Sequence, residues 1–298
     1  MIVKRFLIAI SIFALVFSSC TVSNQLKQLN IEAQQQYDQK SYEDAFSLYN
    51  QIITSKQERG KKAEASIYQN AGISAWYIDD EQNAIRYLEE VKEQSAASAA
   101  TYYYIAKAYL KVDNLSREII NLEEFTEKYP NNKLISEVNG QLFMAYVRSE
   151  NWQKAFDHWS TLVDEQQNQP ELIEGYIAVN QQLGNSSEVL PLANKLLKAD
   201  SDNPTALEVL ALYYYNLAED RYQAEMKAYE KNRTNRQYKQ LLDALKVINS
   251  NFKVSRDYFE RLYKQNPDPR FANYLGNIYT RFDNKQKAKY YYGKAKQN

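Results

Sequence analysis

The chain has 298 residues, with 37 basic and 37 acidic side chains but only one cysteine and one histidine. One cysteine cannot build a disulfide framework or a thiolate metal cage, and one histidine excludes most zinc sites and most catalytic triads. A formal net charge of zero argues against non-specific nucleic-acid binding, which needs many cationic side chains to neutralise phosphates. The seven Gly and six Pro are far below their usual shares, so we expect long, uninterrupted helices.

The first twenty residues have the pattern of an export signal. Lys4 and Arg5 form a basic region, residues 6–17 are apolar, and two serines precede Cys20. The apolar run is shorter than the roughly twenty residues that span a bilayer, which favours a cleaved signal peptide. The segment resembles a bacterial lipoprotein signal, and this implies lipidation of Cys20. Phe17 departs from that pattern, where Leu is commonest, and an ordinary signal peptide with an incidental cysteine is the alternative.

A repeat runs through the rest of the chain. A small residue is followed twelve positions later by alanine in several places, most clearly at Gly72 with Ala84 and at Gly276 with Ala288. Residues in the same phase recur about every 34 positions, which is the period of stacked helical hairpins. The residues that mark this phase are Gly72, Ala106, Phe143, Ile177 and Ala211.

With this period the chain resembles the tetratricopeptide-repeat family. The last unit fits the signature of that family best, at Leu275, Gly276, Tyr279 and Ala288. The resemblance implies an all-α, right-handed α-solenoid of about seven helix-turn-helix units, which we place at residues 27–298. The signal peptide would occupy residues 1–19, and the lipidated cysteine with a short tether would occupy residues 20–26.

The sixth unit carries a long insertion. Ala211 and Ser255 are separated by 44 positions, where other units have twelve. The added sequence contains neither Gly nor Pro, so we expect both helices to lengthen into a hairpin over about residues 205–266. Its predicted tip is basic and includes Arg233 and Arg236. Three interpretations remain open for this tip, namely a solvated end, a partner-docking prong, and a contact for nucleic acid or acidic lipid.

No catalytic constellation is recognisable in the sequence. Every Gly is isolated, so no phosphate-binding loop occurs. Paired acidic residues such as Asp79 and Asp80 are predicted in turns or on helix surfaces, whereas glycosidases need two acids that face each other across a pocket. His158 has no candidate partner for catalysis. We therefore predict a non-enzymatic protein with no cofactor and no metal site.

The first helices of a stacked array line its concave side, where an extended segment or a partner helix can bind. The resemblance places ligand contacts at set positions of these helices. In the seventh unit the same positions form a basic, amide-rich strip, which suits either a carboxylate ligand or a polar cap of the solenoid. Carried onto this chain, the candidate residues are Trp76, Tyr77, Tyr103, Lys107, Lys111 and Arg148 in the second to fourth units, and Arg270, Asn273, Asn277 and Arg281 in the seventh.

The leading hypothesis is a membrane-anchored tetratricopeptide-repeat lipoprotein that holds a partner protein in the bacterial cell envelope, in assembly or secretion machinery. It predicts a protein partner, membrane contact through the lipid anchor and no nucleic acid. We expect a periplasm-facing position at the outer membrane, although the sequence leaves the inner membrane and surface exposure open. The alternative is a glycan-binding lipoprotein, because aromatic faces such as those of the 26 Tyr stack on sugar rings.

Overall fold

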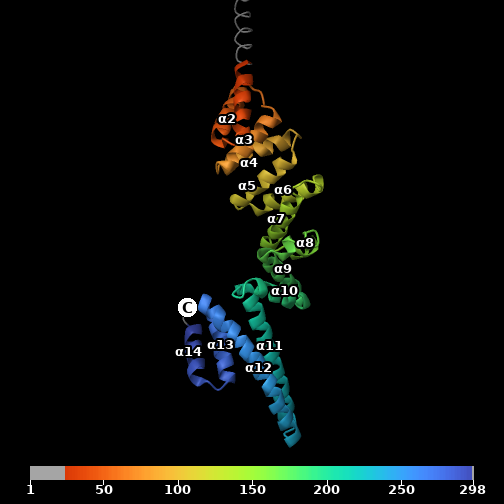
Figure 1. The fold of residues 1–298 in the computed structure, drawn as a ribbon, viewed down its shortest axis with the longest axis vertical. Helices are drawn as coiled ribbons and strands as arrows, with labels where there is room; N and C mark the ends of the chain where they lie inside the picture. The colour runs from red at the N-terminus through yellow and green to blue at the C-terminus, as the bar shows by residue number, and fades with distance from the viewer. Residues whose placement is uncertain (1–23, 297–298) are drawn as a thin grey trace, which may run out of the picture. The chain divides into compact units, whose positions relative to one another are not determined.

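A computed structural model describes residues 24–296 (Figure 1). The predicted signal peptide and Cys20 lie outside the described residues. Throughout the described range the chain forms helices joined by short connections, and it contains no β-strand. No helix in this range is long and apolar enough to cross a bilayer.

The chain divides into two compact units, the first ending at Asn151 and the second beginning at Trp152. In the first unit, successive helices pack against one another in chain order from α2 to α7. Its helices are the one over residues 24–38, α2 (Tyr42–Gln57), α3 (Ala65–Tyr77), α4 (Glu81–Glu93), α5 (Ala99–Lys111), α6 (Leu115–Lys128) and α7 (Ile135–Arg148).

The second unit continues the alternation of helices and tight turns. It contains one short 3₁₀ turn and the long helix pair that the insertion predicts. Its elements are α8 (Trp152–Trp159), η1 (Gln166–Asn168), α9 (Pro170–Leu183), α10 (Ser186–Ala199), α11 (Pro204–Lys231), α12 (Asn235–Gln265), α13 (Pro269–Arg281) and α14 (Lys285–Ala295).

Several turns inside the helix pairs share one construction. Asp79 has a left-handed backbone with φ of 59°, and the next residue, Asp80, accepts a hydrogen bond from the backbone N–H of Asn83 at 3.1 Å. A left-handed residue stops the first helix, and a side-chain cap satisfies a free N–H at the start of the second. The same pair of features recurs at Asp113 and Asn114 and at Asp283 and Asn284.

Close approach of the two helices explains the small residues of the repeat. A Cβ atom at Gly72 would lie 2.7 Å from the Cγ of Leu88, and one at Gly276 would lie 2.6 Å from the ring of Tyr292. Such separations are far below van der Waals contact, so glycine is required at both positions. The alanine twelve positions after Gly72, Ala84, is completely buried.

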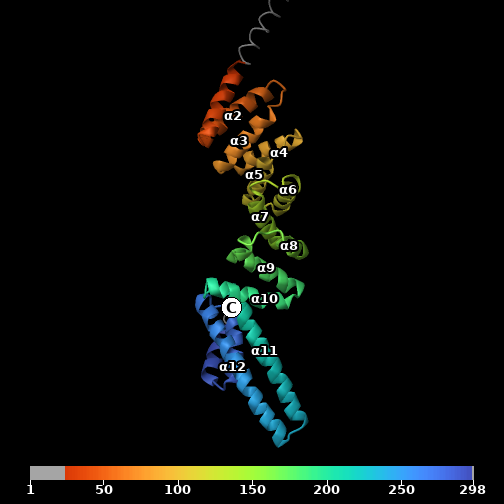
Figure 2. The ribbon, with the colours of Figure 1, turned by 45° about the vertical axis from the view of Figure 1, so that its right-hand side comes forward.

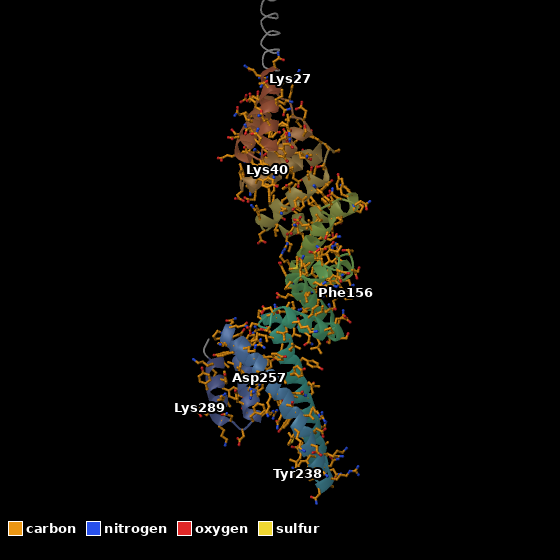
Figure 3. The ribbon with its side chains drawn as sticks, in the orientation of Figure 1. Lys27, Lys40, Phe156, Tyr238, Asp257 and Lys289 are labelled. Carbon is orange, nitrogen blue, oxygen red and sulfur yellow. The ribbon has the colours of Figure 1, made fainter. Side chains whose placement is uncertain are left out.

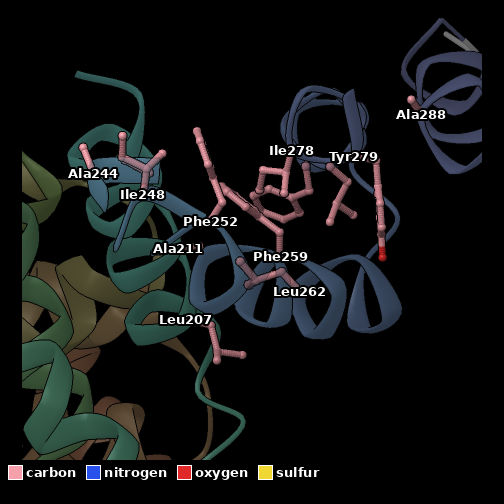
Figure 4. Packing of buried hydrophobic residues seen from close by; sticks show 13 residues of the cluster. Leu207, Ala211, Ala244, Ile248, Phe252, Phe259, Leu262, Ile278, Tyr279 and Ala288 are labelled. Carbon is pink, nitrogen blue, oxygen red and sulfur yellow. The ribbon is translucent and has the colours of Figure 1, made fainter. Parts of the chain in front are cut away.

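Separate clusters of buried side chains hold the helices of each unit together. In the first unit, Tyr49, Ile52 and Ile53 of α2 pack with Ile67 and Tyr68 of α3. In the second unit, one cluster joins α11, α12, α13 and α14, and Figure 4 shows Phe252 and Phe259 of α12 beside Ile278 of α13. Neither helix of a pair could bury its apolar face alone, so the neighbouring pair completes the core.

The insertion forms a long antiparallel hairpin, as predicted. α11 has 28 residues and α12 has 31, whereas α13 has 13. At 1.5 Å per residue, the difference between α11 and α13 corresponds to about 22 Å of extra helix. Figures 1 and 2 show α11 and α12 side by side along this length. The core continues into the distal half of the hairpin, where Ala218, Leu241, Ala244 and Ile248 are buried.

Candidate functional site

Five aromatic side chains meet on one side of the first unit, and together we call them the aromatic surface. The rings of Tyr42 and Tyr77 are stacked with centroids 4.0 Å apart and an interplanar angle of 4°. Trp76 meets Tyr104 at 5.2 Å, and the hydroxyl groups of Tyr77 and Tyr104 are hydrogen-bonded at 2.8 Å. Tyr37 completes the aromatic surface through an edge contact with Tyr42 at 5.9 Å.

Helix packing explains why these residues meet. Tyr37 ends the first helix of one pair, Trp76 and Tyr77 end α3, and Tyr104 lies in α5, so the aromatic surface follows three successive first helices. Tyr77 is 43% exposed, whereas Trp76 packs against the buried Ala75, Ala84 and Ala108. The indole therefore forms a floor, and Tyr77 presents its ring and hydroxyl to solvent.

Two lysines of α5 border the aromatic surface. The Nζ atoms of Lys107 and Lys111 lie 5.0 and 5.3 Å from the centre of the Trp76 ring, within cation–π range. Lys107 also lies 3.8 Å from a carboxylate oxygen of Glu137, and Lys111 forms ion pairs with Asp79 and Glu81. The border is thus polar but electrically balanced.

Burial and hydrogen bonding keep several tyrosines here protonated. Burial raises the pKa of Tyr37 to about 12. The pKa of Tyr103 is also raised, chiefly by burial and then by the hydrogen bond that its hydroxyl donates to Glu137 Oε1 at 2.5 Å. The pKa of Tyr104 is raised by burial and by its contact with Tyr77. At neutral pH these groups are therefore neutral, and the hydroxyls of Tyr103 and Tyr104 are already hydrogen-bonded within the chain.

All five residues that the sequence predicts in the second and third units thus come together, since Tyr103 contacts both Tyr104 and Lys107. The repeat pattern does not single out Tyr37, Tyr42 and Tyr104 as site residues. Tyr37 could have been found, because it follows Ala33 by four positions just as Trp76 follows Gly72. Beside Tyr37, the first helix forms a shallow hollow of about 520 Å³ that is lined by Asn30, Ile31, Gln34, Gln35, Asp38 and Gln39.

No protein-family model and no curated protein matches the chain, but solved structures do. The C-terminal part of a TPR repeat-containing protein from Cytophaga hutchinsonii is 13% identical, with 89% of this chain and 93% of that chain covered and a TM-score of 0.56. YrrB, described as a TPR protein with an unusual peptide-binding site, is 14% identical, with 64% and 96% covered and a TM-score of 0.52. MamA of AMB-1 is 15% identical, with 59% and 92% covered and a TM-score of 0.51.

The chain has the tetratricopeptide-repeat fold. This confirms the fold class that the period and the small-residue spacing predict, because two of these structures are described as TPR proteins. The identities are low, so the likeness concerns the fold alone.

In the fourth repeat, the predicted site residue Arg148 is engaged inside the chain. Its Nη2 donates to both carboxylate oxygens of Glu118 at 2.6 Å. Glu118 is only 3% exposed, and its burial raises the pKa of the carboxyl group while Arg148 opposes that rise. In other repeats the position of Glu118 holds Ala84 or Ala288. Arg148 therefore compensates a buried charge.

The predicted strip of the seventh repeat also makes contacts within the chain. Arg281 forms an ion pair with Glu219 of α11, and its guanidinium lies 4.0 Å from the centre of the Tyr222 ring. Asn277 donates to the hydroxyl of Tyr215 at 3.2 Å. Arg270 pairs with Asp268 at 2.7 Å, and Asn273 is exposed. The strip thus joins α13 to the long hairpin, with Asn273 on its solvent side.

The hairpin tip is built as predicted, with Asn232, Arg233 and Thr234 between the two helices. Thr234 caps α12 by accepting a hydrogen bond from the N–H of Gln237 at 3.2 Å. Arg233 and Arg236 are both exposed. Within residues 24–296, no group of three or more His, Cys, Asp or Glu residues is placed to hold a metal ion.

Proposed function

We propose that the protein is a non-enzymatic scaffold that binds a partner protein through the aromatic surface. The supporting observation is the exposed Tyr77 ring, which is stacked on Tyr42 and supported from below by Trp76. Tyrosine and tryptophan dominate binding energy at protein interfaces, because they combine large apolar area with a polar group and little entropy to lose. The proposal also agrees with the description of YrrB as a TPR protein with a peptide-binding site.

The charges around the aromatic surface indicate how such a partner would be recognised. Lys107 and Lys111 already face carboxylates of the same unit, so net charge contributes little to selection. Aromatic contact and hydrogen bonds to tyrosine hydroxyls remain, and both suit an extended segment or a helix with an apolar side. We therefore expect an affinity that depends weakly on salt.

We further propose that the protein is lipidated at Cys20 and acts in the bacterial cell envelope, facing the periplasm at the outer membrane as part of assembly or secretion machinery. The support is the sequence alone, namely the basic residues Lys4 and Arg5, the apolar run 6–17 and the cysteine after two serines. Mass spectrometry of the N-terminal peptide tests this step. A cysteine without acyl groups, or a chain still carrying residues 1–19, would contradict it.

The partner hypothesis is tested by co-purification of full-length, C-terminally tagged protein from solubilised membranes. We expect the unsubstituted protein to recover one envelope protein in stoichiometric amount. The Tyr77→Ser variant should recover much less of it. The matched control is Tyr213→Ser in the second unit, because Tyr213 is 41% exposed and Tyr77 is 43% exposed. Circular dichroism of both variants checks that the fold is retained.

Equal recovery of the partner with both variants would contradict binding at the aromatic surface. If no protein is recovered at all, the alternative of glycan binding gains weight, because the same exposed aromatic rings stack on sugars. Calorimetric titration with peptidoglycan fragments and polysaccharides then decides, since flat traces would exclude these glycans as ligands.

A further inference from the structure

The free end of the long hairpin carries an unbalanced cluster of positive charge, which we call the cationic tip. Residues 227–239 contain one acidic side chain, Glu230. Residues 285–296 are also basic, with five lysines and no acidic side chain, but there Lys287 lies 3.9 Å from a carboxylate oxygen of Glu260 in α12. The five cations of the cationic tip are Lys227, Lys231, Arg233, Arg236 and Lys239, and all are exposed.

Ion pairing separates the two arginines of the cationic tip from the other arginines of the second unit. Among residues 152–296, every arginine outside the tip lies within 4.0 Å of a carboxylate oxygen, whereas none of the five tip cations does so. A long helix can satisfy its charges with partners three or four residues away, as Arg221 does with Glu225. At this spacing the cationic tip has only Glu230, near Lys227 and Arg233, and Asp243, near Lys239, and among the described residues no tip cation lies within 4.0 Å of either carboxylate. The paired arginines are Arg221, Arg256, Arg261, Arg270 and Arg281.

Two tyrosines accompany these charges. The rings of Tyr229 and Tyr238 lie 5.9 Å apart, one on each helix. Tyr238 is 50% exposed, and Figure 3 shows it near the free end of the hairpin. Tyrosine has an apolar ring and a polar hydroxyl, so it favours a boundary between an apolar phase and water.

The distribution of the cations suits a broad surface more than a pocket. Lys227 and Lys231 are four residues apart on α11, while Arg236 and Lys239 are three apart on α12, and Arg233 lies in the connection. The charges therefore occupy both helices and the loop that joins them, at the end of an element that extends about 22 Å beyond ordinary helix length. A plane of negative charge can meet all of them at once, whereas a concave protein site would enclose only one side.

We propose that the cationic tip binds the surface of an anionic lipid bilayer. Lysine and arginine close to such a surface each strengthen binding about fivefold, and interfacial tyrosines add apolar contact at headgroup depth. Nucleic acid would also attract the cations, but neither tyrosine is needed for a purely electrostatic contact with phosphates. This inference is independent of the aromatic surface, whose residues belong to the first unit.

The test uses residues 21–298, which retain every described helix and lack both Cys20 and the apolar run 6–17. Binding is measured by co-sedimentation with vesicles of phosphatidylcholine alone and with vesicles containing 30% phosphatidylglycerol. We expect binding to the anionic vesicles only, weakened at high salt. The double variant Arg233→Gln, Arg236→Gln should bind them about 30-fold more weakly.

The matched control is the double variant Arg59→Gln, Arg117→Gln, which removes the same charge from exposed positions of the first unit. Among the described residues neither of these arginines lies in an ion pair, and the control should bind like the parent. Equal weakening by both double variants would overturn the proposal, because it would show only an effect of net charge. Absence of binding to anionic vesicles, including the case in which the protein binds only duplex DNA or acidic proteins, would overturn it as well.

Discussion

The close approach of α13 and α14 at Gly276 gives a sharp prediction of stability. A Cβ atom there would lie 2.6 Å from two carbon atoms of the Tyr292 ring. The ring cannot turn aside freely, because the Tyr292 hydroxyl donates to Asn277 Oδ1 at 2.8 Å and lies 3.2 Å from Thr280 Oγ1. Overpacking of this kind costs about 1–3 kcal/mol, and alanine recovers about 0.5–1 kcal/mol of helix propensity. Gly276→Ala should therefore lower stability by about 1 kcal/mol, with the two ranges allowing about 0–2.5 kcal/mol.

Gly293 in the same helix pair is the control, because a Cβ atom there would meet nothing within 4 Å. Gly293→Ala should raise stability by about 0.5 kcal/mol through helix propensity alone. Hydrogen exchange at the amides of α13 and α14 is the suitable measurement, since repeat arrays need not unfold in one step. If Gly276→Ala protects these amides as well as Gly293→Ala does, close helix approach is not the reason for glycine at this position.

Three further predictions concern single contacts. Arg148→Met should destabilise the first unit by about 2 kcal/mol. This is less than the roughly 3–5 kcal/mol lost when a fully buried pair is broken, because the Arg148 side chain is 40% exposed. Denaturation measured at falling pH should show a smaller difference between variant and parent, since acid protonates Glu118. Burial and a hydrogen bond to Glu89 raise the pKa of Tyr109 to about 12. The contribution of Tyr109 to folding stability should therefore be complete below pH 10 and should be lost as the pH rises towards 12. Tyr109→Phe should remove this fall in stability between about pH 10 and pH 12. Ile248→Ala should cost about 2–5 kcal/mol and should speed hydrogen exchange in the distal halves of α11 and α12 more than in α9.

The repeat could be predicted from sequence because its physical cause is local. A small residue and an alanine twelve positions later mark the place where two helices of one pair touch, and the structure shows that contact at Gly72 and Leu88. The long hairpin followed from the same rule, since the insertion between Ala211 and Ser255 lacked any residue that would end a helix. The Ser255 hydroxyl donates to the Ala211 carbonyl at 2.8 Å, so the two marked positions do face each other.

The aromatic surface was predicted only in part. Register along the first helices placed Trp76, Tyr77 and Tyr103 correctly on one side, because helical spacing carries that information. Tyr42 begins a second helix and joins the surface across a turn, and its stacking on Tyr77 depends on how two repeats are packed. The spacing of residues within one helix does not predict a contact between two repeats.

The role of charged side chains was the least predictable feature, because whether a charge is paired within the chain depends on partners that are distant in sequence. Arg148 and Arg281 have the register of ligand-binding residues, yet their carboxylate partners are 30 and 62 positions away and belong to other helices. Glu118 was visible as a departure from the repeat, but nothing in the sequence linked it to Arg148.

The cationic tip and the seventh-repeat strip differ in how their positive charges are compensated. Both are basic in sequence, but the strip lies against α11 and its arginines are neutralised by Glu219, Glu208 and Asp268. The hairpin extends beyond its neighbouring helices, so its end can find partners only on its own two helices, and residues 227–239 supply a single acid. A fold that pairs every other arginine of this unit leaves Arg233 and Arg236 exposed to whatever the hairpin meets.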